Sequence, residues 1–238
     1  MDVEEFIADL KSRHDAISYA NHPFLRDMIA GTLPLRAIGG WVIQNGYHLA
    51  GECYKEFCLF ALRIPDRKIK KSLIDNLAGE VFGIRGVEAH WSLALRLAVA
   101  CGWDEAEARA EPILPETDAI TNYCVANAVI GSAEAVMAGV TLGGEGPFGP
   151  LSPKIARSLR ENYKLDKHQT EYVWEHEEAD AEHAETGWDM VRAYATDARR
   201  QAEIRGHYER MTLMFWEYYD GCTRAYVQGR KPGYHSRV

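Results

Sequence analysis

The stretch Glu171–Glu185 reads EYVWEHEEADAEHAE, and its charge pattern decides how the whole chain is interpreted. Seven of its fifteen residues are acidic, and none is lysine or arginine. Such a run usually forms the solvated face of a helix. However, successive residues of a helix are rotated by about 100° around its axis. On a helical wheel, the residues in the arc within about 60° of His176 on either side are small and apolar residues together with Asp180 and His183. The other six acids lie outside this arc, so we expect a helix with an inward aspartate between two histidines.

This inward HxxxDxxH pattern indicates a metal site. Burying a carboxylate and two imidazoles without partners would cost several kcal/mol, and a metal ion compensates that cost directly. Spacings of four and three residues place the three side chains along one helical face, and these donors suit Zn, Fe or Mn. A lone buried histidine is more often a hydrogen-bonded core residue, but three such side chains together favour a metal.

Other segments offer further inward donors. Glu80 ends an apolar stripe and His90 shares a face with apolar residues, although each alone also fits a helix-end carboxylate or a histidine at the edge of the core. Glu134 is the only charged residue in a long apolar segment, and Glu145 follows three helical turns later, on the same face if the helix continues. Helical bundles build dinuclear iron sites from such side chains.

The periodicity of the chain predicts an all-α protein. Apolar residues recur at spacings of three and four, and no convincing period-two run occurs. We expect one domain of about seven to nine helices over residues 1–229, followed by a basic tail over residues 230–238. The expected long helices cover about residues 3–19, 35–62, 66–81, 88–101, 115–142, 167–195 and 197–228, with shorter ones after residues 104 and 153.

Composition excludes several classes of function. The 238 residues include 27 basic and 35 acidic side chains, giving a net charge of −8, and no basic cluster interrupts the sequence. We therefore expect no nucleic-acid binding. No apolar run approaches the length of a membrane span, and the N-terminus does not resemble a signal peptide. Five scattered cysteines without a CxxC motif suit reduced thiols, so we expect a soluble, cytoplasmic protein that does not bind membranes.

The segment EHEEADAEHA (residues 175–184) closely resembles the metal-binding segment of the haem-oxygenase-like diiron oxidases, which include p-aminobenzoate synthases. Thiaminase II and pyrroloquinoline-quinone synthase belong to the wider superfamily. The segments NHPFLRDMIAGTL (21–33), DNLAGE (75–80) and HWSLALRLAVACGW (90–103) agree in order and spacing. The resemblance implies a haem-oxygenase-like helical bundle that binds two irons per chain. The implied ligands are Glu80, His90, Glu145, His176, Asp180 and His183.

Two departures from the family pattern concern the ligands. Glu80 and His90 are ten residues apart, whereas the family usually places them closer together. A loop at residues 83–86 can absorb the excess, and Glu88 is the fallback ligand. Glu145 falls in a glycine-rich break, and polarity alone favours Glu134 instead. The spacing of the resembling segments selects Glu145.

The resemblance implies a non-haem dinuclear-iron oxidase or oxygenase that uses O2 to oxidise a small amino-acid-, amine- or fatty-acid-like metabolite. N-oxygenation, desaturation and oxidative C–C cleavage all fit such a site. Self-consuming p-aminobenzoate synthesis is not expected, because the required tyrosine and lysine positions align with Leu25 and Leu159. The alternatives are a cofactor-free quinone-forming or thiaminase-like enzyme and a partner-binding protein with structural iron. Manganese in place of iron stays open.

Two further patterns concern the substrate and the quaternary structure. Gln44, His48 and Glu52 share a helical face with Trp41, where they form either a substrate pocket or a solvated or dimer-facing strip. Aromatic residues at helical spacing over residues 208–226 are typical of a core or a dimer interface. We therefore expect a homodimer that acts on a small molecule.

Overall fold

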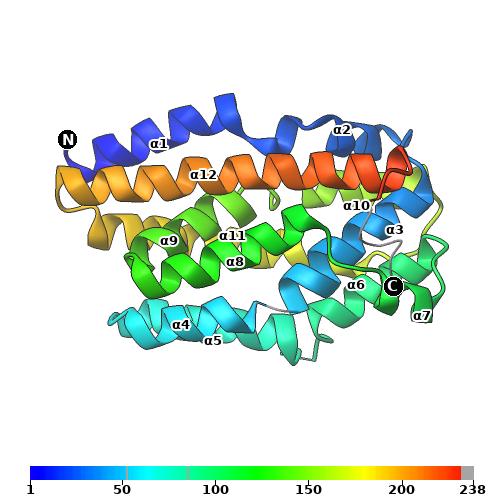
Figure 1. Ribbon diagram of the computed structural model, residues 1–238, viewed down its shortest axis with the longest axis horizontal. Helices are drawn as coiled ribbons and strands as arrows, with labels where there is room; N and C mark the ends of the chain where they lie inside the picture. Colours follow the sequence, from blue (N-terminus) through cyan, green and yellow to red (C-terminus); the bar gives the residue numbers. More distant parts are fainter. Residues whose placement is uncertain (52, 85, 232–238) are drawn as a thin grey trace.

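The computed structural model describes residues 1–51, 53–84 and 86–231, and within them it leaves aside the side chains of residues 14–16 and 177–184. This part of the chain contains no β-strand, which confirms the all-α prediction (Figure 1). The basic tail predicted over residues 230–238 lies mostly outside the described residues. The α-helices are α1 (Val3–Ile17), α2 (Pro23–Ala30), α3 (Leu35–Val42), α4 (Tyr54–Arg63), α5 (Arg67–Val81), α6 (His90–Ala100), α7 (Glu105–Ala110), α8 (Pro115–Ile130), α9 (Ala133–Gly139), α10 (Ser152–Glu161), α11 (Glu171–Tyr194) and α12 (Ala198–Cys222).

The described residues contain more helices than the seven to nine expected, because two of the expected long helices are divided and residues 23–30 form a separate helix, α2. Short irregular helical segments also occur. A 3-10 turn, η1, covers Tyr19–Asn21. The π-helical segments are η2 (Ile43–Ala50), η3 (Val140–Glu145) and η4 (Thr223–Val227). The long helix expected over residues 35–62 is therefore divided into α3, η2 and α4.

The helix expected over residues 115–142 is divided by a break at Gly131. The backbone of Gly131 is extended, with φ −100° and ψ −163°, so the helical hydrogen-bond pattern of α8 ends there. Ser132 then begins α9, because its Oγ accepts a hydrogen bond from the backbone N–H of Ala135 at 3.3 Å. A serine in this position satisfies one of the amide groups that a helix start leaves without an internal partner. The chain continues through α9 directly into η3.

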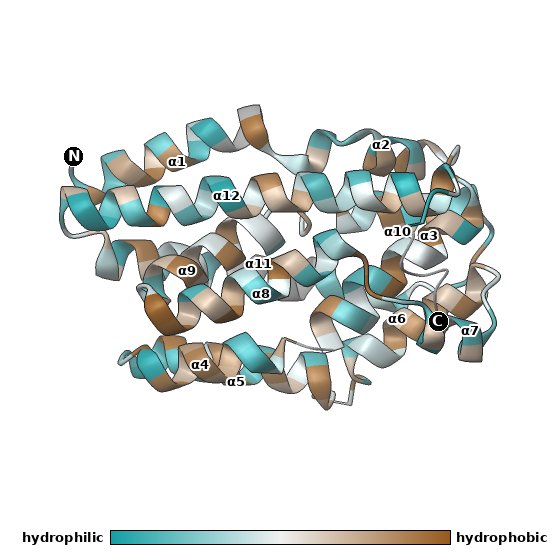
Figure 2. Ribbon diagram, in the orientation of Figure 1, coloured by the Kyte–Doolittle hydropathy of each residue, from teal (hydrophilic) through white to brown (hydrophobic). Residues whose placement is uncertain are grey.

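The long helices α11 and α12 run through the bundle, and the other elements pack on them (Figure 1). α12 packs against α8, α9 and η3, and α1 lies along it at one side. α11 packs against η3, α9 and α10, while α4 and α5 pair with each other at the opposite side of the molecule from α1. Figure 2 shows hydrophobic and hydrophilic residues alternating along each helix, as expected for helices that bury one face.

The π-helical segment η3 lies in close contact with both long helices, and two glycines permit this. A Cβ at Gly143 would lie 2.7 Å from the carbonyl oxygen of Tyr208 in α12. A Cβ at Gly187 in α11 would lie 2.4 Å from the Oγ1 of Thr141 in η3. Both distances are shorter than a real Cβ contact, so a side chain at either position would force the neighbouring segment to shift. The close packing brings Glu145, at the end of η3, into the interior.

None of the helices in the described part of the chain is both long and apolar enough to cross a lipid bilayer.

Candidate metal centre

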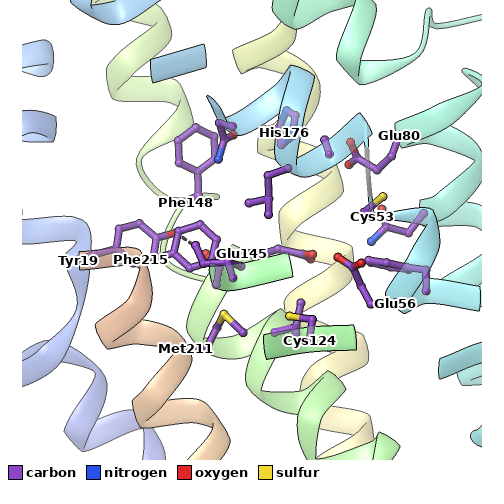
Figure 3. A pocket seen from close by; sticks show the side chains of 18 of the residues that line it. Tyr19, Cys53, Glu56, Glu80, Cys124, Glu145, Phe148, His176, Met211 and Phe215 are labelled. Atoms are coloured by element: carbon purple, nitrogen blue, oxygen red, sulfur yellow. Dashed lines mark hydrogen bonds between the residues drawn. The ribbon is translucent and has the colours of Figure 1, made fainter. Parts of the chain in front are cut away.

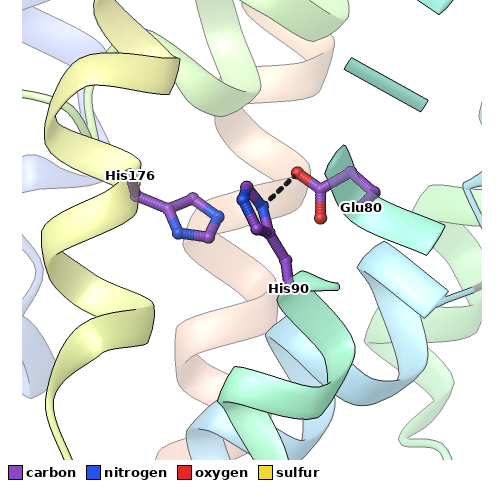
Figure 4. Close-up of side chains that lie close together, drawn as sticks. All are labelled: Glu80, His90 and His176. Carbon is purple, nitrogen blue, oxygen red and sulfur yellow. Dashed lines mark hydrogen bonds and ion pairs between the residues drawn. The ribbon is translucent and has the colours of Figure 1, made fainter. Parts of the chain in front are cut away.

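Three side chains of types that can bind a metal ion, each from a different helix, meet in the interior of the bundle (Figure 4). Glu80 comes from the last turn of α5, His90 begins α6, and His176 lies in the second turn of α11. All three are buried, and one ligand atom of each lies within 4.8 Å of the others. The Nδ1 of His90 lies 2.8 Å from Glu80 Oε1, and the two imidazole rings are 4.7 Å apart.

The loop between α5 and α6 makes the Glu80–His90 contact possible. Gly83 adopts a positive φ of 79°, and a Cβ there would lie 2.5 Å from a backbone oxygen, so only glycine fits this turn. The indole Nε1 of Trp91 donates a hydrogen bond to the carbonyl of Val81 at 3.1 Å, which ties the start of α6 to the end of α5. The ten-residue spacing between the two side chains is therefore taken up by the loop.

A backbone carbonyl fixes the orientation of His176. Its Nδ1 lies 2.7 Å from the carbonyl oxygen of Tyr172, one helical turn earlier. Because a carbonyl can only accept a hydrogen bond, Nδ1 carries the proton and Nε2 keeps its lone pair. Metal-binding histidines in proteins are commonly held in this way, with one ring nitrogen donating to a carbonyl and the other available to the metal.

A cavity of about 100 Å³ adjoins this cluster. Glu80 and His176 line it, together with Glu145 from η3 and Glu56 from α4. In Figure 3 the carboxylates of Glu145 and Glu56 point toward one another, with Glu80 and His176 nearby. Most of the remaining lining is apolar and comes from residues such as Phe57, Ile120, Phe148, Met211 and Phe215.

The electrostatics of the cavity favour cations. Burial raises the pKa of the Cys53 thiol well above its usual range, and the charges of Glu80, Glu56 and Glu145 raise it further. Burial also raises the pKa of the Cys124 thiol well above its usual range, and the charges of Glu56 and Glu145 raise it further. Several carboxylates therefore act on one small, buried volume. Carboxylates and neutral imidazoles are donors that suit Fe, Mn and Zn, so the residues present fit a metal centre.

Glu56 was not anticipated from the sequence. It is 4% exposed and lies on the face of α4 that also carries Cys53, Phe57 and Phe60. An acidic residue inside an apolar stripe at helical spacing is the signal that could have identified it, because such a carboxylate must be buried when the stripe packs.

The structure brings some of the predicted ligands together. Glu145 shares the cavity with Glu80 and His176. Asp180 and His183 fall within the span of α11, but their side chains lie outside the described residues.

The two alternative carboxylates lie elsewhere. Glu134 accepts a hydrogen bond from Ser132 Oγ at 2.9 Å and lines a separate pocket with Arg199 and Arg200. Glu88 is exposed and binds the side chains of Ser92 and Arg96. The cavity described above includes neither of them.

The tentative substrate pocket at Gln44 and His48 is corrected by the structure. The buried Gln44 side chain bonds the carbonyl of Pro112, the hydroxyl of Tyr226, the amide of Leu114 and the hydroxyl of Thr117. His48 Nε2 contacts the carbonyl of Glu111 at 2.7 Å. Both side chains therefore hold the 111–117 connection in place, while Glu52 lies outside the described residues. The cavity is lined from this segment by Asn45, Leu49, Ala50 and Cys53 instead.

Leu25 and Leu159 stand at the positions where the p-aminobenzoate synthases have their self-consumed tyrosine and their lysine amine donor. Leu25 and Leu159 are fully buried core residues, and neither belongs to the described lining of the cavity. A tyrosine does line it, because Tyr19 lies at the cavity and donates a hydrogen bond from its hydroxyl to the carbonyl of Gly144 at 2.5 Å.

Comparisons with known proteins identify the family and the fold of the chain. Residues 41–215 match the sequence profile of a family described as iron-containing redox enzymes. A domain with a haem-oxygenase-like fold from Shewanella denitrificans superposes with a TM-score of 0.76 at 17% identity, over 97% of this chain and 95% of that one. A TenA homologue from Pyrococcus horikoshii superposes with a TM-score of 0.71 at 14% identity, over 92% and 98% of the two chains. These likenesses confirm the haem-oxygenase-like fold. No curated protein matches the sequence significantly.

Proposed function

The chain belongs to the family of iron-containing redox enzymes, and from this premise we propose that it is a non-haem dinuclear-iron oxidase or oxygenase. The observation that carries the proposal is the buried cluster of Glu80, His90 and His176 beside a cavity that Glu56 and Glu145 also line. Bundles with inward carboxylates and histidines from several helices are a common setting for two irons.

The proposed ligands come from five segments of the bundle. Glu80, His90, His176 and Glu145 would hold the irons, and Glu56 is a further carboxylate within the same cavity. Asp180 and His183 complete the set proposed from the sequence. When bound, the two irons would supply the activation of O2, which protein side chains cannot perform alone.

The side chains around the irons orient the donors and exclude water. The carbonyl of Tyr172 keeps the proton of His176 on Nδ1, and Glu80 holds the ring of His90 through its contact with Nδ1. The apolar walls limit solvent in the cavity, which favours oxidation of a substrate over side reactions. Asn45 and Asn76 line the same cavity and place amide groups where a polar end of the substrate can be oriented.

The cavity limits the substrate to a small molecule with a substantial apolar part. At about 10–15 Å³ for each water-sized group, a volume of about 100 Å³ accommodates about seven to ten non-hydrogen atoms. An amino-acid-, amine- or fatty-acid-like metabolite of this size fits, and N-oxygenation, desaturation and oxidative C–C cleavage are the proposed outcomes. A longer chain would require the lining side chains to move.

A metal-free enzyme of the thiaminase-like type is the alternative, since TenA homologues share the fold. Such an enzyme would need an activated nucleophile at the cavity. The two cavity thiols, Cys53 and Cys124, have pKa values raised by burial and by neighbouring carboxylates, which is the opposite of activation. The cavity therefore favours the iron enzyme.

Iron loading tests the proposal. Protein loaded with ferrous iron without oxygen and then desalted should retain about two irons per chain, and it should consume O2 on mixing. Glu80→Ala and His176→Ala should each lose much of the iron, as measured by plasma mass spectrometry, because each removes a buried donor. Glu88→Ala is the matched control and should load as the parent does. Wild-type iron content in both cavity variants would overturn the assignment.

A further inference from the structure

A basic groove lies on the surface where α10, residues 162–170 and the start of α11 meet. Its cationic side chains are all exposed, and they are Arg157, Arg160, Lys164 and Lys167. The groove also contains two acids, Glu161 and Asp166. Because these four cations outnumber the two acids, the local charge of the groove is positive, although the whole chain carries −8. The carboxylate of Asp166 is engaged within its own turn, where it accepts a hydrogen bond from the amide of Gln169 at 2.8 Å.

An indole connects this groove with the helix of the metal centre. Trp174 lines the groove and lies in α11 two residues before His176. Two residues correspond to about 200° of rotation and about 3 Å along the axis, so the two rings lie on opposite sides of the same helix. The Nε1 of Trp174 is buried, and no acceptor for it occurs among the described residues. An oxidisable aromatic ring thus lies between a charged surface and a proposed iron ligand.

The proposed function creates a need that this groove can meet. O2 takes up four electrons, and a substrate oxidised by two electrons supplies only two of them. An oxidase of this kind that turns over repeatedly must have its two ferric irons returned to the ferrous state, which takes two electrons from outside the chain. We propose that the groove docks a small acidic one-electron-carrier protein, and that Trp174 and His176 form the route by which its electrons enter; this rests on the dinuclear-iron function proposed above. Two reduced carriers are each oxidised by one electron, and each electron reduces one ferric iron, so no atom is transferred.

The charge distribution favours an acidic protein over other anionic partners. A compact acidic protein can align its negative patch with the groove and keep the rest of its surface away from the acidic remainder of this chain. A nucleic acid would extend along that acidic surface and be repelled. A free small anion would make no use of the aromatic ring beside the cations.

Binding of oxidised plant-type [2Fe–2S] ferredoxin, an acidic carrier, tests the docking surface by calorimetry. Metal-free protein should bind it at about 20 mM NaCl and at least about tenfold more weakly at about 200 mM NaCl. The double variant R160E/K164E should lower the affinity at least about tenfold, whereas R67E/R210E should change it less than about twofold. The control pair is exposed on α5 and α12 and changes the net charge equally.

Equal effects of the two double variants would overturn the docking proposal, because only net charge would then matter. Tighter binding of basic cytochrome c than of ferredoxin would also overturn it. Phosphate that displaces ferredoxin at an ionic strength where NaCl does not would identify a small-anion site instead, and would equally refute the proposal.

Stopped-flow mixing of reduced ferredoxin with the iron-loaded, air-oxidised protein tests the electron route. Trp174→Leu should slow the oxidation of ferredoxin at least several-fold while leaving its affinity within about twofold, and Trp174→Phe should retain more of the rate. An unchanged rate in Trp174→Leu would refute the route. Failure of the dinuclear-iron function is recognised separately, since the protein would then not load iron, whereas the binding measurements need no metal.

Discussion

We expect Gly187→Ala to destabilise the protein because Gly187 is a point of close packing between α11 and η3. The added Cβ would lie 2.4 Å from Thr141 Oγ1 and 2.9 Å from Leu142 Cγ, so the two segments must separate. Overpacking of a buried site typically costs about 1–3 kcal/mol of unfolding free energy. In a chain of this length, that loss lowers Tm by about 2–12 °C.

The same substitution should disturb the proposed metal centre. Moving η3 away from α11 separates Glu145, which ends η3, from His176, which lies on α11. We therefore expect the Gly187→Ala variant to retain less iron than the parent after anaerobic loading and desalting. Urea denaturation followed by circular dichroism measures the stability, and plasma mass spectrometry measures the iron.

Gly206→Ala is the matched control. Gly206 is exposed in the long helix α12, and no described atom lies within 4 Å of the position that its Cβ would occupy. Alanine is favoured over glycine in a helix by about 1 kcal/mol, so this variant should be more stable than the parent and load iron normally. A Gly187→Ala protein as stable as the parent, with full iron content, would refute the close packing of η3 on α11.

Three further predictions follow from individual residues. Glu145→Ala should lower the iron content or the O2 reactivity of loaded protein more than Glu134→Ala, and the reverse ranking in the same assays would make Glu134 the ligand. Iron-loaded protein incubated with O2 and reductant, but no metabolite, should keep its intact mass; p-aminobenzoate with loss of a tyrosine side chain would identify Tyr19 as the source. Burial lowers the pKa of His22 and His207 below 6.5, so the unfolded chain binds more protons than the folded chain, and urea denaturation should show unfolding free energy falling as pH drops below about 6.5. His207→Gln should reduce that loss, and an unchanged pH dependence would show that His207 does not contribute.

The sequence predicted the regular parts of the bundle well. α11 extends over Glu171–Tyr194, within the predicted 167–195, and His176 is buried as its arc of apolar neighbours indicated. In a regular helix the 3.6-residue period reports which side chains share a face, so the inward position of His176 follows from the sequence alone. The position of His90 beside Glu80 does not follow from the sequence, because this contact depends on the turn at Gly83 and not on a helical period.

The irregular parts were less predictable. The helical wheel grouped Gln44, His48 and Glu52, but the chain is π-helical over residues 43–50. Hydrogen bonds from residue i to i+5 add a residue to each turn, so a wheel with a period of 3.6 assigns the wrong face to the cavity. Long-range contacts add to the error, since the bonds of Gln44 are made to residues more than sixty positions away.

The basic groove and the burial of Glu56 were not predicted from the sequence, for a different reason. The four cations of the groove are interspersed with two acids along residues 157–167, so they do not form an uninterrupted basic run in the sequence. Only the end of α10 and the following turn bring the cations to one surface. Glu56 belongs to none of the segments that resemble the family, and its burial depends on how α4 packs.

Two of the three π-helical segments in the described part of the chain, η2 and η3, supply much of the cavity wall. η2 provides Asn45 and Leu49, and η3 provides Gly144 and Glu145. A π-helical turn is rare and is frequently found at functional sites, because its extra residue is harder to accommodate than a regular turn. Glu80, His90 and His176, by contrast, lie on regular helices. Two of the three described π-helical segments therefore lie at the cavity, and regular helices hold three of the proposed donors, while Glu145 comes from η3.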